Sequence, residues 1–254
     1  MNDGGAGTRA GYNEIMSKPL EALRIKIFAD GAEKASMVAL AKNPLIKGFT
    51  TNPTLMRKAG ITDYAGFAKE VLGEIKDKPV SFEVFSDDFA DMERQARIIA
   101  SWAPNVYVKI PITNTKGQPS YELTRKLSAD GIKLNVTAVF TLAQVAESAK
   151  ALSPAVSAII SVFAGRIADT GVDPMPLMRQ AKAIIAGNRN FELLWASPRE
   201  LLNIYHAEEA GSDIITLTPD VLKRAVNIGL DLETFSLQTV AMFYDDGRKA
   251  GYTL

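Results

Sequence analysis

Short apolar runs alternate along this chain with longer segments in which apolar residues recur at helical spacing. The short runs are rich in β-branched residues and span residues 25–29, 46–49, 80–84, 105–110, 133–139, 156–161, 191–196 and 213–217. The longer segments span residues 34–43, 63–75, 88–103, 121–131, 142–152, 175–187, 199–211 and 219–229. Buried strands joined by amphipathic helices are typical of a parallel sheet. The pattern therefore predicts an α/β protein with eight strand-then-helix units.

Eight such units favour a single closed (β/α)8 TIM barrel. An open, doubly wound sheet is the alternative, but it usually carries a glycine-rich phosphate turn after its first strand. The residues Asp30-Gly31-Ala32 at this place do not form a GxGxxG motif. We expect the barrel domain to cover residues 21–254 and to follow a flexible or helical N-terminal extension at residues 1–20. An additional C-terminal helix over residues 232–249 could cover a barrel face or reach a neighbouring subunit.

Composition narrows the classes of function. The 254 residues include 29 Lys plus Arg and 29 Asp plus Glu, so no overall charge attracts nucleic acid or an anionic membrane. The chain has no cysteine and a single histidine, His206, which excludes disulfides, thiolate zinc sites and a cysteine nucleophile. The polar, glycine-rich N-terminus contains no apolar signal segment, and no later run reaches membrane-spanning length. We therefore expect a cytoplasmic protein.

One lysine ends an apolar strand. In the stretch NVYVKIP, Lys109 stands where the predicted strand opens into a loop. An amine held against apolar walls is more readily neutral, and a neutral amine can attack a carbonyl to form a Schiff base. The alternative is a structural lysine whose ammonium group extends from the strand end into water.

Polar residues gather at the ends of the predicted strands. In a (β/α)8 barrel, catalytic groups occupy these C-terminal strand ends and the following loops. The residues are Asp30, Thr50, Thr51, Asn52, Glu83, Lys109, Asn135, Thr137, Ser161, Arg166, Ser197 and Arg199. We expect them to converge on one mouth of the barrel, although TTNP, with Pro53 near the first helical position, is also an ordinary helix start.

Five motifs carry a resemblance to a known family. They are GFTTNPTL after the second predicted strand, VYVKIP at the fourth, GIKLNVTAVFT at the fifth, SVFAGRI at the sixth and WASPR at the seventh. With them the chain resembles the transaldolase family of (β/α)8 barrel enzymes, from FADGAE at the first strand to FSLQTVAMFYDDGRKAGY near the C-terminus. Its length is similar to that of the small-transaldolase branch, which also contains fructose 6-phosphate aldolases.

The resemblance implies a catalytic set. Lys109 would form a Schiff base with a ketose phosphate, so that the bond between substrate carbons three and four can break. Asp30 would be the acid/base for the carbon-four hydroxyl. Glu83 and Thr137 would hold a water that shuttles protons during imine formation and hydrolysis.

The same resemblance implies binding roles. Asn52, Asn135 and Ser161 would hold the hydroxyls of the dihydroxyacetone fragment, and Thr50 or Thr51 would support the pocket. Arg166 and Arg199, helped by Ser197, would bind the substrate phosphate, because guanidinium groups match phosphate oxygens in bidentate fashion. The alternative for each arginine is a surface ion pair.

Two positions bear on the reaction. This chain has Glu83 and Phe163, and in this it resembles the transaldolases. The aldolases tend to carry glutamine and tyrosine at these two positions. The resemblance therefore implies a transaldolase of the pentose phosphate pathway. A fructose 6-phosphate aldolase that releases free dihydroxyacetone is the alternative, and a non-catalytic sugar-phosphate-binding barrel or an enzyme with a changed donor is another.

The chain also departs from the family pattern. Gly31, Val162, Ala164 and Pro198 replace residues that the family usually carries, which leaves pocket shape and substrate range open. No metal or organic cofactor is implied, since the imine replaces the Lewis acid of metal-dependent aldolases. The expected partners are small-molecule sugar phosphates and further copies of the chain in a homo-oligomer.

Overall fold

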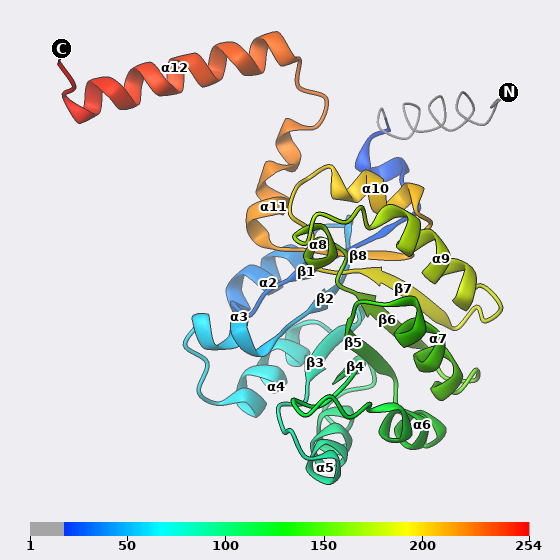
Figure 1. The fold of residues 1–254 in the computed structure, drawn as a ribbon. Coiled ribbons are helices and arrows are strands. Elements are labelled where there is room, and N and C mark those ends of the chain that lie inside the picture. Colours follow the sequence, from blue (N-terminus) through cyan, green and yellow to red (C-terminus); the bar gives the residue numbers. More distant parts are fainter. Residues whose placement is uncertain (1–17, 254) are drawn as a thin grey trace, which may run out of the picture.

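Eight short parallel strands close into a barrel in the computed structural model, which describes residues 18–253 (Figure 1). The strands pair in sequence order, and the last pairs with the first. They are β1 (Lys26–Asp30), β2 (Ile46–Thr50), β3 (Val80–Glu83), β4 (Val106–Pro111), β5 (Leu134–Val139), β6 (Ala158–Val162), β7 (Phe191–Trp195) and β8 (Ile214–Leu217). The predicted (β/α)8 barrel is confirmed. The predicted N-terminal extension lies outside the described residues up to residue 17.

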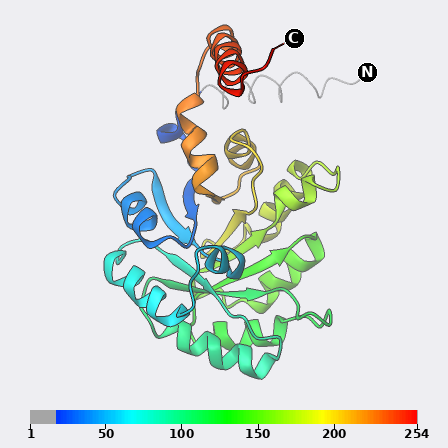
Figure 2. The ribbon, with the colours of Figure 1, turned by 90° about the vertical axis from the view of Figure 1, so that its left-hand side faces the viewer.

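Helices surround the barrel on its outside (Figures 1 and 2). The predicted ones are present as α2 (Lys34–Ala41), α4 (Tyr64–Glu74), α5 (Phe89–Ala100), α6 (Tyr121–Ala129), α7 (Leu142–Ala151), α9 (Met175–Ile185), α10 (Asn203–Glu209) and α11 (Pro219–Lys223). The short turns η1 (Leu20–Ala22) and η2 (Arg224–Asn227) lie before β1 and after α11. Two short helices, α3 (Pro53–Lys58) and α8 (Ala164–Ala168), directly follow β2 and β6 and lie at the mouth of the barrel.

The apolar core has two layers. The larger one lies between the sheet and the helices, and a small cluster of Phe28, Ile159, Leu194, Ala196 and Ile214 fills the inside of the barrel. Phe28 fits there because Gly48 on the neighbouring strand has no side chain. A Cβ atom at residue 48 would lie 2.5 Å from Cζ of the Phe28 ring. The inner cluster lies below the polar residues at the strand ends, and two of its members, Leu194 and Ala196, line the same cavity as those residues.

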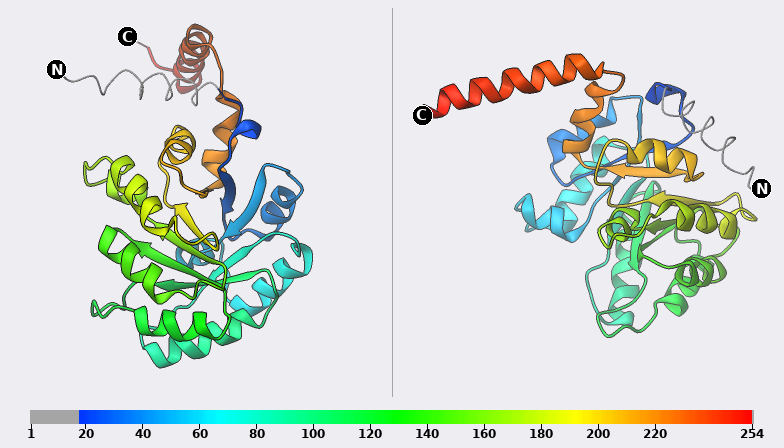
Figure 3. Two further views of the ribbon diagram at one scale, coloured as in Figure 1. Left: turned by 90° about the vertical axis from the view of Figure 1, so that its right-hand side faces the viewer. Right: turned by 45° about the horizontal axis from the view of Figure 1, so that its top comes forward.

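The last helix does not cover a barrel face. Helix α12 (Leu232–Ala250) is capped at its start by Asp231, whose side chain accepts a hydrogen bond from the Thr234 N–H, and at its end by Gly251 with φ +69°. None of its residues is buried. Figures 1 and 3 show it extending away from the barrel, so this structure contradicts the first of the two predicted positions. No helix within residues 18–253 is long and apolar enough to cross a membrane.

Candidate active site

A cavity of about 570 Å³ opens at the C-terminal ends of the strands. The structure brings nearly all of the predicted site residues to its wall: Asp30, Thr50, Asn52, Glu83, Lys109, Thr137, Ser161, Phe163, Arg166, Ser197 and Arg199. We call Asp30, Thr50, Glu83 and Lys109 the floor of the pocket and Phe163, Arg166, Ser197 and Arg199 its rim. The positional rule for barrels therefore identified a real cavity.

Lys109 is enclosed at the floor. Only 6% of this residue is exposed, although it stands close to the end of β4. Its Nζ lies 2.9 Å from Oε2 of Glu83 and donates a hydrogen bond of 2.8 Å to the Thr51 carbonyl oxygen. Glu83 and Lys109 are direct partners in the pairing of β3 with β4, which places both side chains in the same cavity. Lys109 is therefore not a lysine that extends from its strand into water.

Glu83 is fixed through its backbone by Tyr64, a residue that the sequence did not single out. The Tyr64 hydroxyl donates to the Glu83 carbonyl oxygen and accepts from the Glu83 N–H, both at 2.9 Å. The Tyr64 ring packs edge-on against Phe82 and lies 5.9 Å from the Trp102 ring. Burial raises the pKa of the Tyr64 phenol, so it remains a neutral donor. The Tyr64 hydroxyl thus provides the backbone hydrogen bonds to Glu83 that a neighbouring strand would provide, because β2 has already ended at this level.

Asp30 ends β1 on the opposite side of the floor. Its Oδ1 accepts a hydrogen bond of 2.8 Å from the Thr50 hydroxyl. Burial raises the pKa of Asp30, while the charge of Lys109 and the hydrogen bond from Thr50 lower it, and the negative charge of Glu83 raises it further. The net direction is upward, which suits a carboxyl group that has to take up and return a proton near neutral pH.

Two predicted residues lie behind the pocket wall. Asn135 is fully buried; its amide nitrogen donates to Ser81 Oγ at 3.1 Å, and its Oδ1 accepts from the Ser161 hydroxyl at 2.6 Å. The Thr51 hydroxyl donates to the Ser81 carbonyl oxygen at 2.9 Å. Asn135 therefore holds Ser161, and Thr51 holds Lys109 through its own carbonyl oxygen.

Asn52 caps a helix and also lines the cavity. Its Oδ1 accepts the Leu55 N–H at 3.0 Å and so caps α3, which follows with Pro53 at the first position. The residue also lines the cavity. Asn52 is thus both the start of a helix and part of the cavity wall.

Two strand ends have unusual backbone conformations. Ala138 has φ 59° and Ser197 has φ 60°, in the left-handed region that residues with a side chain rarely adopt. The pairing of β5 with β6 also shifts register between Val136 and Val139. Thr137 and Ser197 therefore lie where the backbone is strained, a feature that clusters at functional sites.

The rim depends on a close approach of two backbones. Gly165 follows β6 and donates a hydrogen bond of 3.3 Å to the Ala196 carbonyl oxygen. A Cβ atom at residue 165 would lie 1.6 Å from the Ser197 carbonyl oxygen, so only glycine fits without moving the backbone. Gly165 in the SVFAGRI motif thereby brings Arg166 next to the loop that carries Ser197.

The two rim arginines differ in their partners. Arg166 lies over the Phe163 ring, with Cζ 5.3 Å from the ring centroid, and forms no ion pair within residues 18–253. Arg199 binds Asp169 with two nitrogens: Nε donates to Oδ1 at 3.0 Å, and a terminal nitrogen contacts Oδ2. The ion-pair alternative is therefore realised for Arg199 and not for Arg166.

Two residues that depart from the pattern of the resembling family differ in their position. Pro198 lines the cavity, whereas the fully buried Val162 does not. Lys58 on α3 and Thr216 on β8 also line it, and the sequence did not single out either residue. In the sequence, Lys58 resembles an ordinary surface lysine near a helix end. Thr216 lies in a short strand whose sequence is typical of the apolar core. Neither pattern carries a signal of function.

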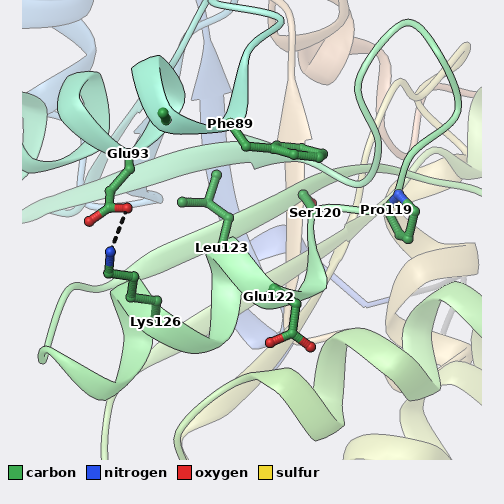
Figure 4. A pocket seen from close by; sticks show the side chains of 8 residues that line it. Phe89, Glu93, Pro119, Ser120, Glu122, Leu123 and Lys126 are labelled. Atoms are coloured by element: carbon green, nitrogen blue, oxygen red, sulfur yellow. Dashed lines mark hydrogen bonds and ion pairs between the residues drawn. The ribbon is translucent and has the colours of Figure 1, made fainter.

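A second hollow lies on the outer wall of the barrel, between α5 and α6 (Figure 4). Its Glu93 and Lys126 point toward each other and form an ion pair of 2.8 Å. It contains none of the predicted site residues. The part of the chain that the structure describes holds no group of three His, Asp or Glu side chains arranged to bind a metal.

Comparisons with known proteins identify a family for the chain. Residues 27–251 match the profile of the family described as Transaldolase/Fructose-6-phosphate aldolase. The chain is 35% identical over 229 residues to "Probable transaldolase" of Novosphingobium aromaticivorans, covering 89% of this chain and 98% of that protein. It is 37% identical over 194 residues to "Probable transaldolase 2" of Listeria monocytogenes, covering 76% and 84%.

A solved structure supports the fold alone. The crystal structure of 2,3-dimethylmalate lyase superposes with a TM-score of 0.52 at 13% sequence identity, covering 96% of this chain and 88% of that one. At this identity the likeness concerns the architecture of the barrel and not its chemistry.

Proposed function

The chain belongs to the transaldolase/fructose-6-phosphate aldolase family, and we propose that it is a transaldolase. It transfers a dihydroxyacetone unit from fructose 6-phosphate or sedoheptulose 7-phosphate to erythrose 4-phosphate or glyceraldehyde 3-phosphate. The observation that carries this proposal is the buried Lys109 amine, which shares one cavity with Glu83 and Asp30. We assign the reaction to the pentose phosphate pathway in the cytoplasm.

The first step forms an imine. The Lys109 amine attacks the carbon-two carbonyl of the ketose phosphate, and the carbonyl oxygen leaves as water. Lys109 must lose a proton before it attacks, and Glu83, 2.9 Å away, is the base in contact with it. Thr137 lines the same cavity and, with Glu83, holds the water that carries protons in this step and in the final hydrolysis.

The second step breaks the bond between carbons three and four. Asp30 takes the proton of the carbon-four hydroxyl, the oxygen becomes an aldehyde carbonyl, and the bonding electron pair moves into the protonated imine to give an enamine. Enamine carbon three then attacks the aldehyde of the acceptor, and Asp30 returns its proton to the new hydroxyl. The raised pKa of Asp30 brings the populations of its protonated and ionised forms closer to each other near neutral pH.

Retention of the enamine separates a transferase from an aldolase. Phe163 lines the pocket, lies 5.8 Å from the Phe140 ring and has no hydroxyl group that could protonate the enamine. The enamine therefore waits for an aldehyde acceptor. Arg166, without a carboxylate partner among residues 18–253, binds the phosphate of donor and acceptor in turn.

The test is to measure products from fructose 6-phosphate with and without erythrose 4-phosphate. A transaldolase produces sedoheptulose 7-phosphate continuously with the acceptor, and without it releases no more glyceraldehyde 3-phosphate than one equivalent per active site. Continuous release of free dihydroxyacetone without acceptor would instead identify an aldolase. Replacing Phe163→Tyr should raise that release, and an unchanged rate would count against the role of Phe163.

The position of Pro198 makes donor choice a separate question, because this residue lines the cavity beside Ser197. A panel of ketose phosphates, assayed with one acceptor, measures it. Fructose 6-phosphate and sedoheptulose 7-phosphate should give the highest kcat/KM. A different ketose phosphate as the best donor would keep the imine chemistry and change the substrate assignment.

The transfer activity should be the same in excess chelator, and its loss would contradict a metal-free mechanism.

We also propose that the protein is a homo-oligomer in which α12 packs against another copy. Phe235, Val240 and Phe243 on this helix are 43%, 61% and 65% exposed, and the helix contacts no barrel face (Figure 2). Burying such side chains against a partner is favourable by about 25 cal/mol per Å². Light scattering of the whole chain should give a multimer, and Phe235→Ser with Phe243→Ser should give a smaller species. A multimer that is unchanged by both substitutions would contradict this role of α12.

A further inference from the structure

Three side chains, Thr216 on β8, Thr50 on β2 and Asp30 on β1, are joined by hydrogen bonds in this order, which we call the row. In the barrel β1 lies between the other two strands (Figure 1). The Thr50 hydroxyl donates to Asp30 Oδ1 at 2.8 Å and lies 2.5 Å from the Thr216 hydroxyl. Thr50 is 3% exposed and Thr216 is 6% exposed, so bulk water does not compete strongly for these hydrogen bonds.

The number of protons fixes the direction of this row. Each threonine hydroxyl has one proton to donate, and an ionised carboxylate can only accept. The proton of Thr50 is used by Asp30, so the contact between the two threonines must be donated by Thr216. The chain of donation therefore runs from Thr216 to Thr50 to Asp30 whenever Asp30 is charged.

The row leaves one carboxylate oxygen available. Within residues 18–253, Asp30 receives a side-chain hydrogen bond only from Thr50 and only at Oδ1, and Asp30 lines the cavity. Oδ2 is thus the oxygen left for a substrate hydroxyl. The charged groups that act on Asp30 from the other strands are Lys109 on β4, which favours the carboxylate, and Glu83 on β3, which opposes it.

We propose that Thr216 is a positioning residue for Asp30, which it orients through Thr50 and not by contact with the reacting atoms. By donating to Thr50, Thr216 keeps the Thr50 hydroxyl donating to Oδ1 of Asp30. Oδ2 of Asp30 then stays directed into the cavity. The role of Asp30 as acid/base, and hence this use of the row, rests on the proposed transaldolase function. The row itself is a property of the folded protein, so it can be tested without turnover.

The row also predicts an electrostatic effect. Hydrogen bonds in a chain polarise one another, so a Thr50 hydroxyl that accepts from Thr216 donates more strongly to Asp30. Loss of the Thr216 hydroxyl therefore destabilises the carboxylate and raises the pKa of Asp30 beyond its already raised value. A purely structural role of Thr216 would change stability and leave this titration where it was.

The experiment is a pH titration of Asp30 by NMR, in protein labelled with ¹³C at the aspartate carboxyl carbon. Asp30→Asn identifies the signal. Thr216→Val removes the hydroxyl and keeps the shape, Thr216→Ser keeps the hydroxyl and removes the methyl group, and Thr50→Val removes the direct donor. Thr124→Val on α6 is the matched control, because Thr124 is 1% exposed and does not line the cavity.

We expect Thr216→Val to raise the pKa of Asp30 by on the order of half a unit, and Thr50→Val by more. Thr216→Ser and Thr124→Val should titrate like the unchanged protein. The low-pH limb of kcat/KM should move with the titration, while borohydride still traps substrate on Lys109. An Asp30 titration unchanged in Thr216→Val, or shifted equally in Thr216→Ser, would overturn the proposal. Absence of any trapped imine would reject the transaldolase function and leave the titration result valid.

Discussion

Lys109 at the floor of the pocket is 6% exposed and held on two sides, whereas Arg166 at the rim is exposed and comes from a helix of five residues. The floor residues lie on barrel strands, whose register sets their relative positions. The rim residues lie on short connections whose geometry depends on a glycine and on two residues with strained or restricted backbones, Ser197 and Pro198. This difference suggests that the floor carries the bond-breaking chemistry and the rim carries the choice of substrate.

The largest effect should come from the floor. Lys109→Met keeps an unbranched side chain and removes the nucleophile, so we expect transfer from fructose 6-phosphate to fall by at least about 10³-fold. The matched control is Lys133→Met, which changes a lysine just before β5 that bonds the Pro104 carbonyl oxygen and does not line the cavity. If Lys109→Met kept a tenth of the activity, the imine mechanism would be wrong.

Asp30→Asn should lower the activity by about 10²–10⁴-fold, because the variant cannot take the proton of the carbon-four hydroxyl. The same variant should be more stable at neutral pH. Burial raises the pKa of Asp30, so the folded protein holds this proton more tightly than the unfolded chain does. The stability from this group is complete below the ordinary aspartate pKa of about 3.9 and is lost as the pH rises through the raised pKa.

Thermal unfolding at several pH values checks that sign. The melting temperature of Asp30→Asn should exceed that of the unchanged protein at pH 7, and the difference should shrink toward pH 4. In the unchanged protein, the low-pH limb of kcat/KM should lie above the ordinary aspartate range. A variant that is less stable at pH 7 would show that the Asp30 carboxylate is net stabilising.

A change that moves the rim and leaves the floor in place gives the next largest effect. Gly165→Ala introduces a Cβ atom 1.6 Å from the Ser197 carbonyl oxygen, so both Arg166 and Ser197 must shift. We expect kcat/KM to fall by roughly 10- to 150-fold or more, mainly through KM, since the phosphate loses charge-assisted hydrogen bonds. Lys109 should still be trapped by borohydride at saturating fructose 6-phosphate. Loss of trapping at saturation would mean that rim and floor are not independent.

The smallest effects separate the two arginines. Arg166→Ala should raise KM by roughly 10- to 150-fold, the equivalent of about 1.5–3 kcal/mol for hydrogen bonds to a charged group. Arg199→Ala should raise it by less than about 5-fold, because this guanidinium is already bound to Asp169 in an exposed ion pair. Equal effects would show that Arg199 leaves Asp169 when the phosphate binds.

Much of the floor was predictable from the sequence, because strand periodicity is strong and barrels place polar strand ends at one mouth. Each predicted strand appears within about two residues of its expected bounds. The sequence could not show that Asn135 lies behind Ser161, since depth along a strand depends on barrel packing. Tyr64 and Thr216 were missed because an aromatic at a helix start and a threonine in an apolar strand both resemble core residues.

The rim was less predictable. Helix α8 has only five residues, too few to show an apolar period, so its position and that of Arg166 came from the motif alone. The ion pair of Arg199 with Asp169 joins residues 30 positions apart in two different connections, and no local pattern signals it. The outward position of α12 could not be predicted either, because an amphipathic sequence does not identify the surface that the helix covers.

The most direct test of the account is to treat the protein with fructose 6-phosphate and borohydride and to locate any mass gain by peptide mass spectrometry. A reduced three-carbon or sugar adduct on the peptide that contains Lys109, and its absence in Lys109→Met, is the predicted result. Folded protein with no adduct, or with an adduct on another lysine, would contradict the Schiff-base mechanism and the assignment of this pocket as the active site.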